Sequence, residues 1–130
     1  MSLFFGKHSL KTYMIMMFLG VNPALAASIS KEEIIKLYSD SSSFSSDGKS
    51  INYYSPNGAY KSINIKTGKQ NNAQWYVTDN REICIKGKKE RCWSLTQTKR
   101  KICFEASGNK FCRLKKDYLR GDQTPAHVSQ

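Results

Sequence analysis

The sequence predicts a mainly β protein: a small antiparallel meander that forms a barrel-like or sandwich domain, preceded by one short N-terminal helix. Apolar and polar residues alternate with a period of two from residue 50 onward, which is the period of a half-buried strand. Turn signals rich in Gly, Asn and Asp recur about every 8 to 12 residues, a spacing typical of all-β domains. Four cysteines lie among residues 84–112, and small exported domains use such cysteines as disulfides.

Residues 1–26 have the features of a secretory signal peptide. Lys7 and Lys11 precede an apolar run over residues 12–21, and small residues follow it at Ala24 and Ala26. A basic region, an apolar region and a small-residue cleavage site in this order are typical of a signal peptide. The apolar run has about ten residues, whereas a membrane span needs about 20. We therefore expect cleavage near Ala26/Ala27, no transmembrane segment after cleavage, and a periplasmic or secreted location.

The start of the mature chain, residues 27–49, predicts a short helix followed by a loop. Ser30 and Glu33 have the spacing of a capping box, in which each residue satisfies a backbone N–H of the other. Apolar residues follow at helical spacing, which predicts a helix over residues 31–39. The next stretch, residues 39–46, is rich in serine, a composition that favours a flexible loop.

A disulfide-stapled β domain is expected over residues 50–120, and residues 121–130 are expected to form a disordered tail. Turn residues bound each strand, and Asn57-Gly58 is the strongest hairpin signal among them. The expected strands cover residues 50–54, 59–65, 73–78, 82–86, 91–97, 101–105 and 110–114.

The four C-terminal strands place large apolar side chains on one face and the cysteines on the other. Successive residues of a strand point to opposite faces of a sheet, so one face collects Ile83, Ile85, Trp93, Leu95, Ile102, Phe104 and Phe111. Polar and charged residues accompany the cysteines. We therefore expect a sheet that buries one face and carries its disulfides on the wetter face.

Four cysteines are expected to form two disulfides: Cys84, Cys92, Cys103 and Cys112. If neighbouring strands form tight hairpins, Cys84 lies opposite Cys92 and Cys103 lies opposite Cys112, close enough to bridge. This pairing is preferred because its registers keep like faces together. Pairing of the two middle strands instead favours Cys92–Cys103 with Cys84–Cys112, and this alternative stays open. The cysteines lack the close ligand pairs of zinc sites, so no metal is expected.

The net charge is +11, and the excess of basic residues is concentrated near the C-terminus. Without Lys7 and Lys11 the chain keeps 19 Lys and Arg against 10 Asp and Glu, and residues 86–120 hold 12 of those basic side chains. Such a surface favours anionic partners, and we expect anionic lipid headgroups or acidic envelope polysaccharide. The candidate anion-binding residues are Lys86, Lys88, Lys89, Arg91, Lys99, Arg100, Lys101, Lys115 and Lys116.

Nucleic acid is a less favoured partner. Aromatic residues are interleaved with the lysines, as in proteins that bind single strands, but they alternate onto the opposite face of the strands. In a meander alternate turns lie at opposite ends of the sheet. Residues 86–91 and 99–101 therefore form two separate clusters instead of one groove.

The sequence holds no constellation typical of an enzyme, and no cofactor is expected. His8 lies in the signal peptide and His127 lies near the C-terminus, so Ser-His-Asp and Cys-His arrangements lack a histidine. The acidic residues have no distinguishing spacing. We expect an exported, non-enzymatic binding or structural module with a basic surface. The alternatives are a secreted effector or antagonist of a host or competitor protein, and a carboxylate-based hydrolase.

Residues 53–92 resemble a family of small secreted bacterial proteins known as domain of unknown function 995. The resemblance lies in residues 53–58, residues 74–80 and the pair Cys84 and Cys92. That family has a tyrosine strand, an Asp/Asn-Gly turn, a Gly-x-Trp-x-Val strand and a cysteine pair. This chain departs from it at Gln74, where a glycine is usual nearby. The resemblance implies a periplasmic or secreted β domain with a Cys84–Cys92 bridge, and it implies no activity.

Overall fold

A computed structural model describes residues 27–127 of the chain. The expected signal peptide, residues 1–26, lies outside the described residues, as do residues 128–130. Within residues 27–127 no helix is long and apolar enough to cross a membrane.

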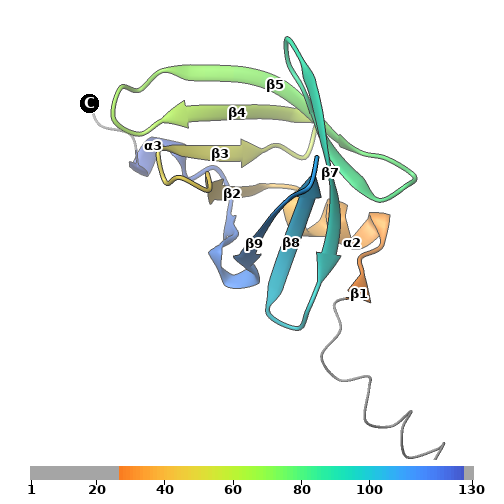
Figure 1. Ribbon diagram of the computed structural model, residues 1–130. Coiled ribbons are helices and arrows are strands. Elements are labelled where there is room, and N and C mark those ends of the chain that lie inside the picture. Colours follow the sequence, from red (N-terminus) through yellow and green to blue (C-terminus); the bar gives the residue numbers. More distant parts are fainter. Residues whose placement is uncertain (1–26, 128–130) are drawn as a thin grey trace, which may run out of the picture.

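The fold is mainly β, as predicted. In the described part of the chain, ten antiparallel strands form one sheet that curls into a half-barrel (Figure 1). The order along the sheet is β10-β2-β3-β4-β5-β6-β7-β8-β9, and β1 pairs separately with β7. The strands are β1 (Ala27–Ser28), β2 (Ser41–Phe44), β3 (Ser50–Tyr54), β4 (Ala59–Asn64), β5 (Gln70–Val77), β6 (Glu82–Lys86), β7 (Glu90–Gln97), β8 (Lys101–Ala106), β9 (Asn109–Leu114) and β10 (Leu119–Arg120). The helices are α2 (Lys31–Tyr38), the 3-10 turn η1 (Lys115–Asp117) and α3 (Thr124–His127).

Helix α2 begins at the predicted capping box. The Ser30 Oγ accepts a hydrogen bond from the Glu33 N–H at 3.1 Å, and the Glu33 carboxylate accepts one from the Ser30 N–H at 3.5 Å. Ile34 and Tyr38 lie one turn apart and are both buried. Because α2 packs against β2 and β5, its apolar face covers one end of the curled sheet.

The predicted strands agree with the observed ones from β3 onward. Residues 50–54 and 82–86 match in full, and the other strands differ by at most three residues at either end. The turn from β3 to β4 uses the predicted Asn57-Gly58 pair. Gly58 has a φ of 93°, a left-handed conformation that glycine adopts without strain.

The prediction of a loop at the serine-rich stretch is wrong for its central part. Ser41, Ser42 and Ser43 belong to strand β2, which pairs with β3 on one side and with β10 on the other, and all three are buried. The Ser41 Oγ donates to the Tyr38 carbonyl at 2.6 Å, and the Ser42 Oγ donates to the Gly121 carbonyl at 2.7 Å. These partners satisfy hydroxyl groups that would otherwise be costly to bury.

The prediction of a disordered tail is wrong for residues 121–127. The Asp122 carboxylate lies 2.6 Å from the Lys61 ammonium and accepts a hydrogen bond from the Thr124 N–H at 3.0 Å. Thr124 is fully buried, and α3 packs against β3. Ile51 and Ile63 are opposite one another in β3 and β4 and buried outside the main core, so both faces of the sheet are covered here.

The core lies on the concave face of the sheet and beneath α2. It contains Ile83, Ile85, Leu95 and Ile102, as the predicted apolar face requires, together with Trp75 of β5. Trp93 and Phe104 pack against this core while partly exposed. The predicted burial of Phe111 is wrong, because 37% of its surface is exposed. It lies on β9, an end strand of the sheet path, where no further strand covers it.

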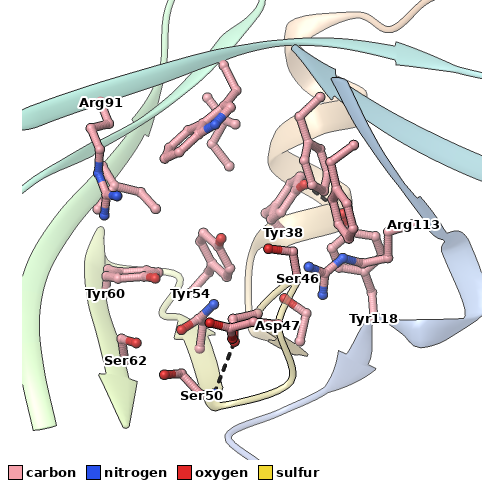
Figure 2. Close-up of a pocket in the computed structure, with 18 residues that line it drawn as sticks. Tyr38, Ser46, Asp47, Ser50, Tyr54, Tyr60, Ser62, Arg91, Arg113 and Tyr118 are labelled. Atoms are coloured by element: carbon pink, nitrogen blue, oxygen red, sulfur yellow. Dashed lines mark hydrogen bonds between the residues drawn. The ribbon is translucent and has the colours of Figure 1, made fainter. Parts of the chain in front are cut away.

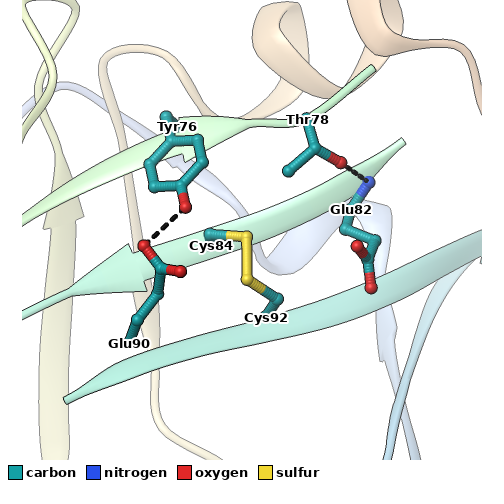
Figure 3. Close-up of a disulfide and its surroundings, with 6 residues drawn as sticks. All are labelled: Tyr76, Thr78, Glu82, Cys84, Glu90 and Cys92. Carbon is teal, nitrogen blue, oxygen red and sulfur yellow. Dashed lines mark hydrogen bonds between the residues drawn. A yellow bond between two sulfur atoms is a disulfide. The ribbon is translucent and has the colours of Figure 1, made fainter. Parts of the chain in front are cut away.

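Both disulfides have the preferred connectivity, Cys84–Cys92 and Cys103–Cys112. Figure 3 shows the first of them, between β6 and β7. In each hairpin the two cysteines are direct partners, with Cα atoms 4.1 and 4.0 Å apart. The face that carries them is drier than predicted, since Cys84 and Cys103 are buried. The two disulfides indicate a compartment other than the reducing cytoplasm.

Candidate functional site: a polar and aromatic cavity

The half-barrel contains a cavity of about 350 Å³ (Figure 2). It lies above the core and is lined by side chains from β2 to β4, from β6 to β9, and from α2. Small molecules bind in concave sites of this kind, in which apolar walls surround a few placed polar groups. The cavity is therefore the first candidate for a functional site.

The two walls of the cavity differ in chemistry. Strands β2 to β4 and the loop after β2 provide small polar side chains: Ser43, Ser45, Ser46, Ser50, Asn52 and Ser62. Strands β6 to β9 provide apolar and aromatic ones: Ile83, Ile85, Trp93, Phe104 and Phe111. The alternation of each strand produces this division, because residues two apart share a face.

Four tyrosines meet between the two walls. The hydroxyl groups of Tyr38 and Tyr118 are 2.7 Å apart, and the ring of Tyr54 packs edge-on against Tyr38 and Tyr60 at centroid distances of 4.9 and 5.1 Å. Burial raises the pKa of Tyr38 and of Tyr54 well above the ordinary tyrosine range, and it raises the pKa of Tyr118 to about 12. These phenols therefore stay neutral and keep their protons at physiological pH.

Arg113 of β9 is a charged group that lines one side of the cavity. Its guanidinium Cζ lies 5.5 Å from the ring centre of Tyr118, 5.6 Å from that of Phe111 and 5.7 Å from that of Phe104. Such distances allow cation–π attraction. The Nε atom of Arg113 is buried and has no hydrogen-bond partner among the described residues. A buried donor without a partner is costly, so an acceptor from a ligand would stabilise it.

A second arginine lines the cavity from the other side. Arg91 of β7 has its Cζ 5.6 Å from the ring centre of Trp93. Figure 2 shows Arg91 and Arg113 well apart, with Tyr54 pointing into the space between them. The ion pairs formed within residues 27–127 are Lys31–Asp79 and Lys61–Asp122. Neither cavity arginine is thus neutralised by a carboxylate of this part of the chain.

Several polar atoms of the serine-bearing wall are also without partners. The Asn52 Oδ1 is buried and accepts no hydrogen bond within the described structure. The hydroxyl groups of Ser43, Ser46 and Ser50 make no side-chain hydrogen bond to another residue in the range 27–127, and each of these serines lines the cavity. The wall therefore offers both donors and acceptors to a ligand.

Among the described residues, Asp47 is the acidic residue that lines the cavity. Its carboxylate accepts hydrogen bonds from the Lys49 N–H at 2.9 Å and the Ser45 Oγ at 2.7 Å. These bonds lower the pKa of Asp47, the Lys49 bond most strongly. A general acid requires the opposite shift, so the environment of Asp47 is that of an ionised structural group.

The structure divides the nine predicted anion-binding residues between two places. Arg91 lines the cavity, whereas Lys86 at the end of β6 and Lys88 and Lys89 in the turn before β7 do not line it and lie next to it along the chain. Lys99, Arg100 and Lys101 lie at the other end of β7, roughly 25 Å away for a strand of this length. Lys115 and Lys116 join them, because the Lys115 N–H donates to the Arg100 carbonyl at 2.7 Å. The role of these residues in anion binding stays a prediction.

Sequence reasoning missed the cavity-lining tyrosines, the serine-bearing wall and the position of Arg113. Arg113 counts in the sequence only as one charge of the basic segment. The strand pattern held a signal for part of this: Ser50, Asn52 and Tyr54 share one strand face, and Phe111 shares a face with Arg113. Polar residues on an otherwise inward face indicate a wet interior.

No family model, curated protein or solved structure matches the chain. The resemblance of residues 53–92 to domain of unknown function 995 stays a prediction. The cavity must therefore be interpreted from its own chemistry.

Proposed function

We propose that this chain is an exported, non-enzymatic binding protein whose half-barrel cavity takes a small organic anion with an apolar part. The proposal depends on the environment of the Arg113 side chain. Its guanidinium lies among three aromatic rings, it has no carboxylate partner within residues 27–127, and its Nε lacks a hydrogen-bond acceptor. A partly desolvated cation of this kind favours a ligand that brings a negative charge and an acceptor.

The rest of the cavity supports the same ligand class. The neutral tyrosines add hydroxyl donors, and Trp93 and Phe104 add apolar surface for a planar or ring-shaped body. Asp47 is the acidic lining residue of the described chain and its pKa is lowered, which favours binding over hydrolysis by paired carboxylates. The disulfides and the expected signal peptide support a periplasmic or secreted location, where acidic envelope components are available.

The proposal is tested with two fluorescent probes of similar shape. Anilinonaphthalene sulfonate carries a negative charge, whereas N-phenyl naphthylamine is neutral. We expect the wild-type protein to bind the sulfonate more tightly than the neutral probe. Arg113→Met is expected to weaken binding of the sulfonate at least tenfold, since hydrogen bonds to charged groups contribute about 1.5–3 kcal/mol, and to leave binding of the neutral probe unchanged.

Arg100→Met is the matched control, because Arg100 lies in the β7–β8 turn, away from the cavity. Circular dichroism establishes that both variants keep the fold. Equal binding of the two probes by the wild-type protein would overturn the proposal, as would equal loss of sulfonate binding in both variants.

A further inference from the structure

We propose that the organic anion is an acidic sugar, a ring that carries both hydroxyl groups and a carboxylate. This inference rests on the function proposed above and specifies its ligand class. Arg113 accounts for a negative charge on the ligand. The polar wall of β2 to β4 and the aromatic wall of β6 to β9 indicate what the rest of the ligand is.

The serine-bearing wall fits a ligand that has several hydroxyl groups. Ser43, Ser46 and Ser50 present hydroxyls without side-chain partners among residues 27–127, and the Asn52 Oδ1 is buried without a donor. A serine hydroxyl both donates and accepts, whereas the Asn52 Oδ1 accepts only. A hydroxyl group is complementary to both kinds of atom, and a sugar ring carries several of them in a fixed arrangement.

The aromatic wall fits the C–H face of the same ring. Trp93 and Phe104 are partly buried, line the cavity, and belong to neighbouring strands, β7 and β8. A sugar ring is apolar on the face that its C–H bonds form, so it buries area against aromatic rings while its rim of hydroxyls points elsewhere. A purely apolar acid would instead cover the serine-bearing wall and leave its polar atoms without partners, which is costly.

An opening between β7 and β8 allows the sugar to be part of a longer chain. The two strands pair only from Ser94 onward, so Arg91 and Trp93 have no partner in β8. A cleft of about 470 Å³ lies there and shares Arg91, Trp93, Phe104 and Phe111 with the cavity. Glu90 and Lys110 line this cleft as well, so with Arg91 its lining carries two basic side chains against one acidic one, a balance that favours further acidic units. The site can thus hold one acidic residue of a polysaccharide while its neighbours lie outside.

The experiment compares three small probes by titration calorimetry: glucuronate, glucose and cyclohexanecarboxylate. Glucuronate has hydroxyls and a carboxylate, glucose lacks the carboxylate, and cyclohexanecarboxylate lacks the hydroxyls. We expect glucuronate to bind at least tenfold more tightly than either of the others, because a site built for hydroxyl groups discriminates strongly against analogues that lack them.

Asn52→Leu is the first variant, and it is expected to weaken glucuronate binding about tenfold without weakening that of cyclohexanecarboxylate. Ser50→Ala is the second variant, a smaller change that keeps the test valid if Asn52→Leu fails to fold, and its expected effect is about threefold in the same direction. Ser94→Ala is the matched control, since Ser94 is exposed and does not line the cavity.

The outcomes separate the two proposals. If cyclohexanecarboxylate binds and depends on Arg113 while glucuronate does not bind, the acidic sugar is excluded and the organic-anion cavity stands. If glucose binds as tightly as glucuronate, the carboxylate has no role and the acidic sugar is again excluded. If glucuronate, cyclohexanecarboxylate and the aromatic sulfonate all fail to bind, both proposals are wrong.

Discussion

Tyr38 and Tyr118 belong to the packed interior and also line the cavity, and their hydroxyl groups contact each other. The two oxygens are 2.7 Å apart, so one hydroxyl donates and the other accepts. The Tyr118 ring also lies 5.5 Å from the guanidinium Cζ of Arg113. Tyr118 therefore contacts both Tyr38 of the core and Arg113 of the cavity lining, so the pKa of its hydroxyl depends on both neighbours.

We predict that Tyr118 titrates near pH 12, because burial raises its pKa to about 12. The measurement is the ultraviolet absorbance of tyrosinate against pH, taken as the difference between the wild-type protein and Tyr118→Phe. Tyr53 also has a pKa of about 12, owing to its hydrogen bond to Asp40, so Tyr53→Phe identifies its separate contribution. A difference curve for Tyr118→Phe centred near pH 10 would contradict the prediction.

The same shift has a consequence for stability. The folded pKa of Tyr118 is raised above its value in the unfolded chain, so the folded state binds the proton more tightly. The stabilisation is fully present below pH 10 and is lost as the pH rises towards about 12. Urea unfolding of the wild-type protein is thus expected to show falling stability across this window, with a smaller fall in Tyr118→Phe.

At the scale of secondary-structure elements, helix α2 depends on its first turn. The helix has eight residues, and isolated helices of this length are unstable in water. Its capping box and the burial of Ile34 and Tyr38 therefore decide whether it forms. Since Tyr38 lines the cavity, the position of this helix also fixes part of the site.

Ser30→Ala is expected to lower the free energy of unfolding by about 1 kcal/mol, the usual loss when a capping side chain is removed. The Glu33 N–H would lose its acceptor, and the Glu33 carboxylate would lose the hydrogen bond from the Ser30 Oγ at 3.1 Å, while the backbone N–H of residue 30 still donates to it. The Gln97 hydrogen bond, which lowers the pKa of Glu33 most, would remain. Ser28→Ala provides the control, because Ser28 is exposed in β1. Equal stability of the two variants in chemical denaturation would show that the cap contributes nothing.

Local signals in the sequence suffice for some elements and fail for others. The period of two locates β3 to β9, and the Asn57-Gly58 pair fixes a turn, because both depend on neighbouring residues. Strand β2 is not predictable in this way. Its three serines favour loops by themselves, and they form a strand because β3, after the next turn, and β10, distant in sequence, supply partners on its two sides. Thr124 is buried for the same reason, since it packs on β3.

At the scale of the whole molecule, the antiparallel strands place alternate turns at opposite ends of the half-barrel, so the basic residues of these turns are divided between the two ends. The turns that join β2 to β3, β4 to β5, and β6 to β7 lie at one end of their strands, and residues 45–47 of the first of them line the cavity. These turns hold more basic than acidic residues: Lys49, Lys66, Lys69, Lys88 and Lys89 against Asp47. A surplus of one charge sign near a site raises the rate at which opposite charges arrive.

We predict that the association rate of anilinonaphthalene sulfonate depends on the lysines near the cavity. Replacing Lys86, Lys88 and Lys89 together by Met is expected to slow association severalfold at low salt. The difference should vanish at 1 M salt, where the screening length is about 3 Å. The control is the triple Met variant of residues 99–101, at the far end of β7. Stopped-flow fluorescence measures both, and equal slowing would show that only net charge matters.

Each of the two disulfides links the two strands of one hairpin, but the side chains around them are packed differently. Their sequence separations are 8 and 9 residues, so the loop-entropy contribution is nearly the same, roughly 2–3 kcal/mol each. Cys84 is fully buried, whereas Cys112 is exposed. Truncating a buried side chain adds the cost of a cavity. The two bridges therefore differ in the packing around their sulfur atoms while their loop lengths are nearly equal.

We predict that the Cys84→Ala/Cys92→Ala variant is less stable than the Cys103→Ala/Cys112→Ala variant. The first bridge joins β6 to β7 in the middle of the sheet, beside buried Ile83 and Ile85, whereas the second joins β8 to the end strand β9. Loss of the first should thus loosen the apolar wall of the cavity and reduce probe binding, while loss of the second should lower stability with less effect on binding. Urea unfolding under oxidising conditions and the sulfonate titration measure both quantities. The reverse order of stability would mean that the end strand, and not the packed centre of the sheet, limits unfolding.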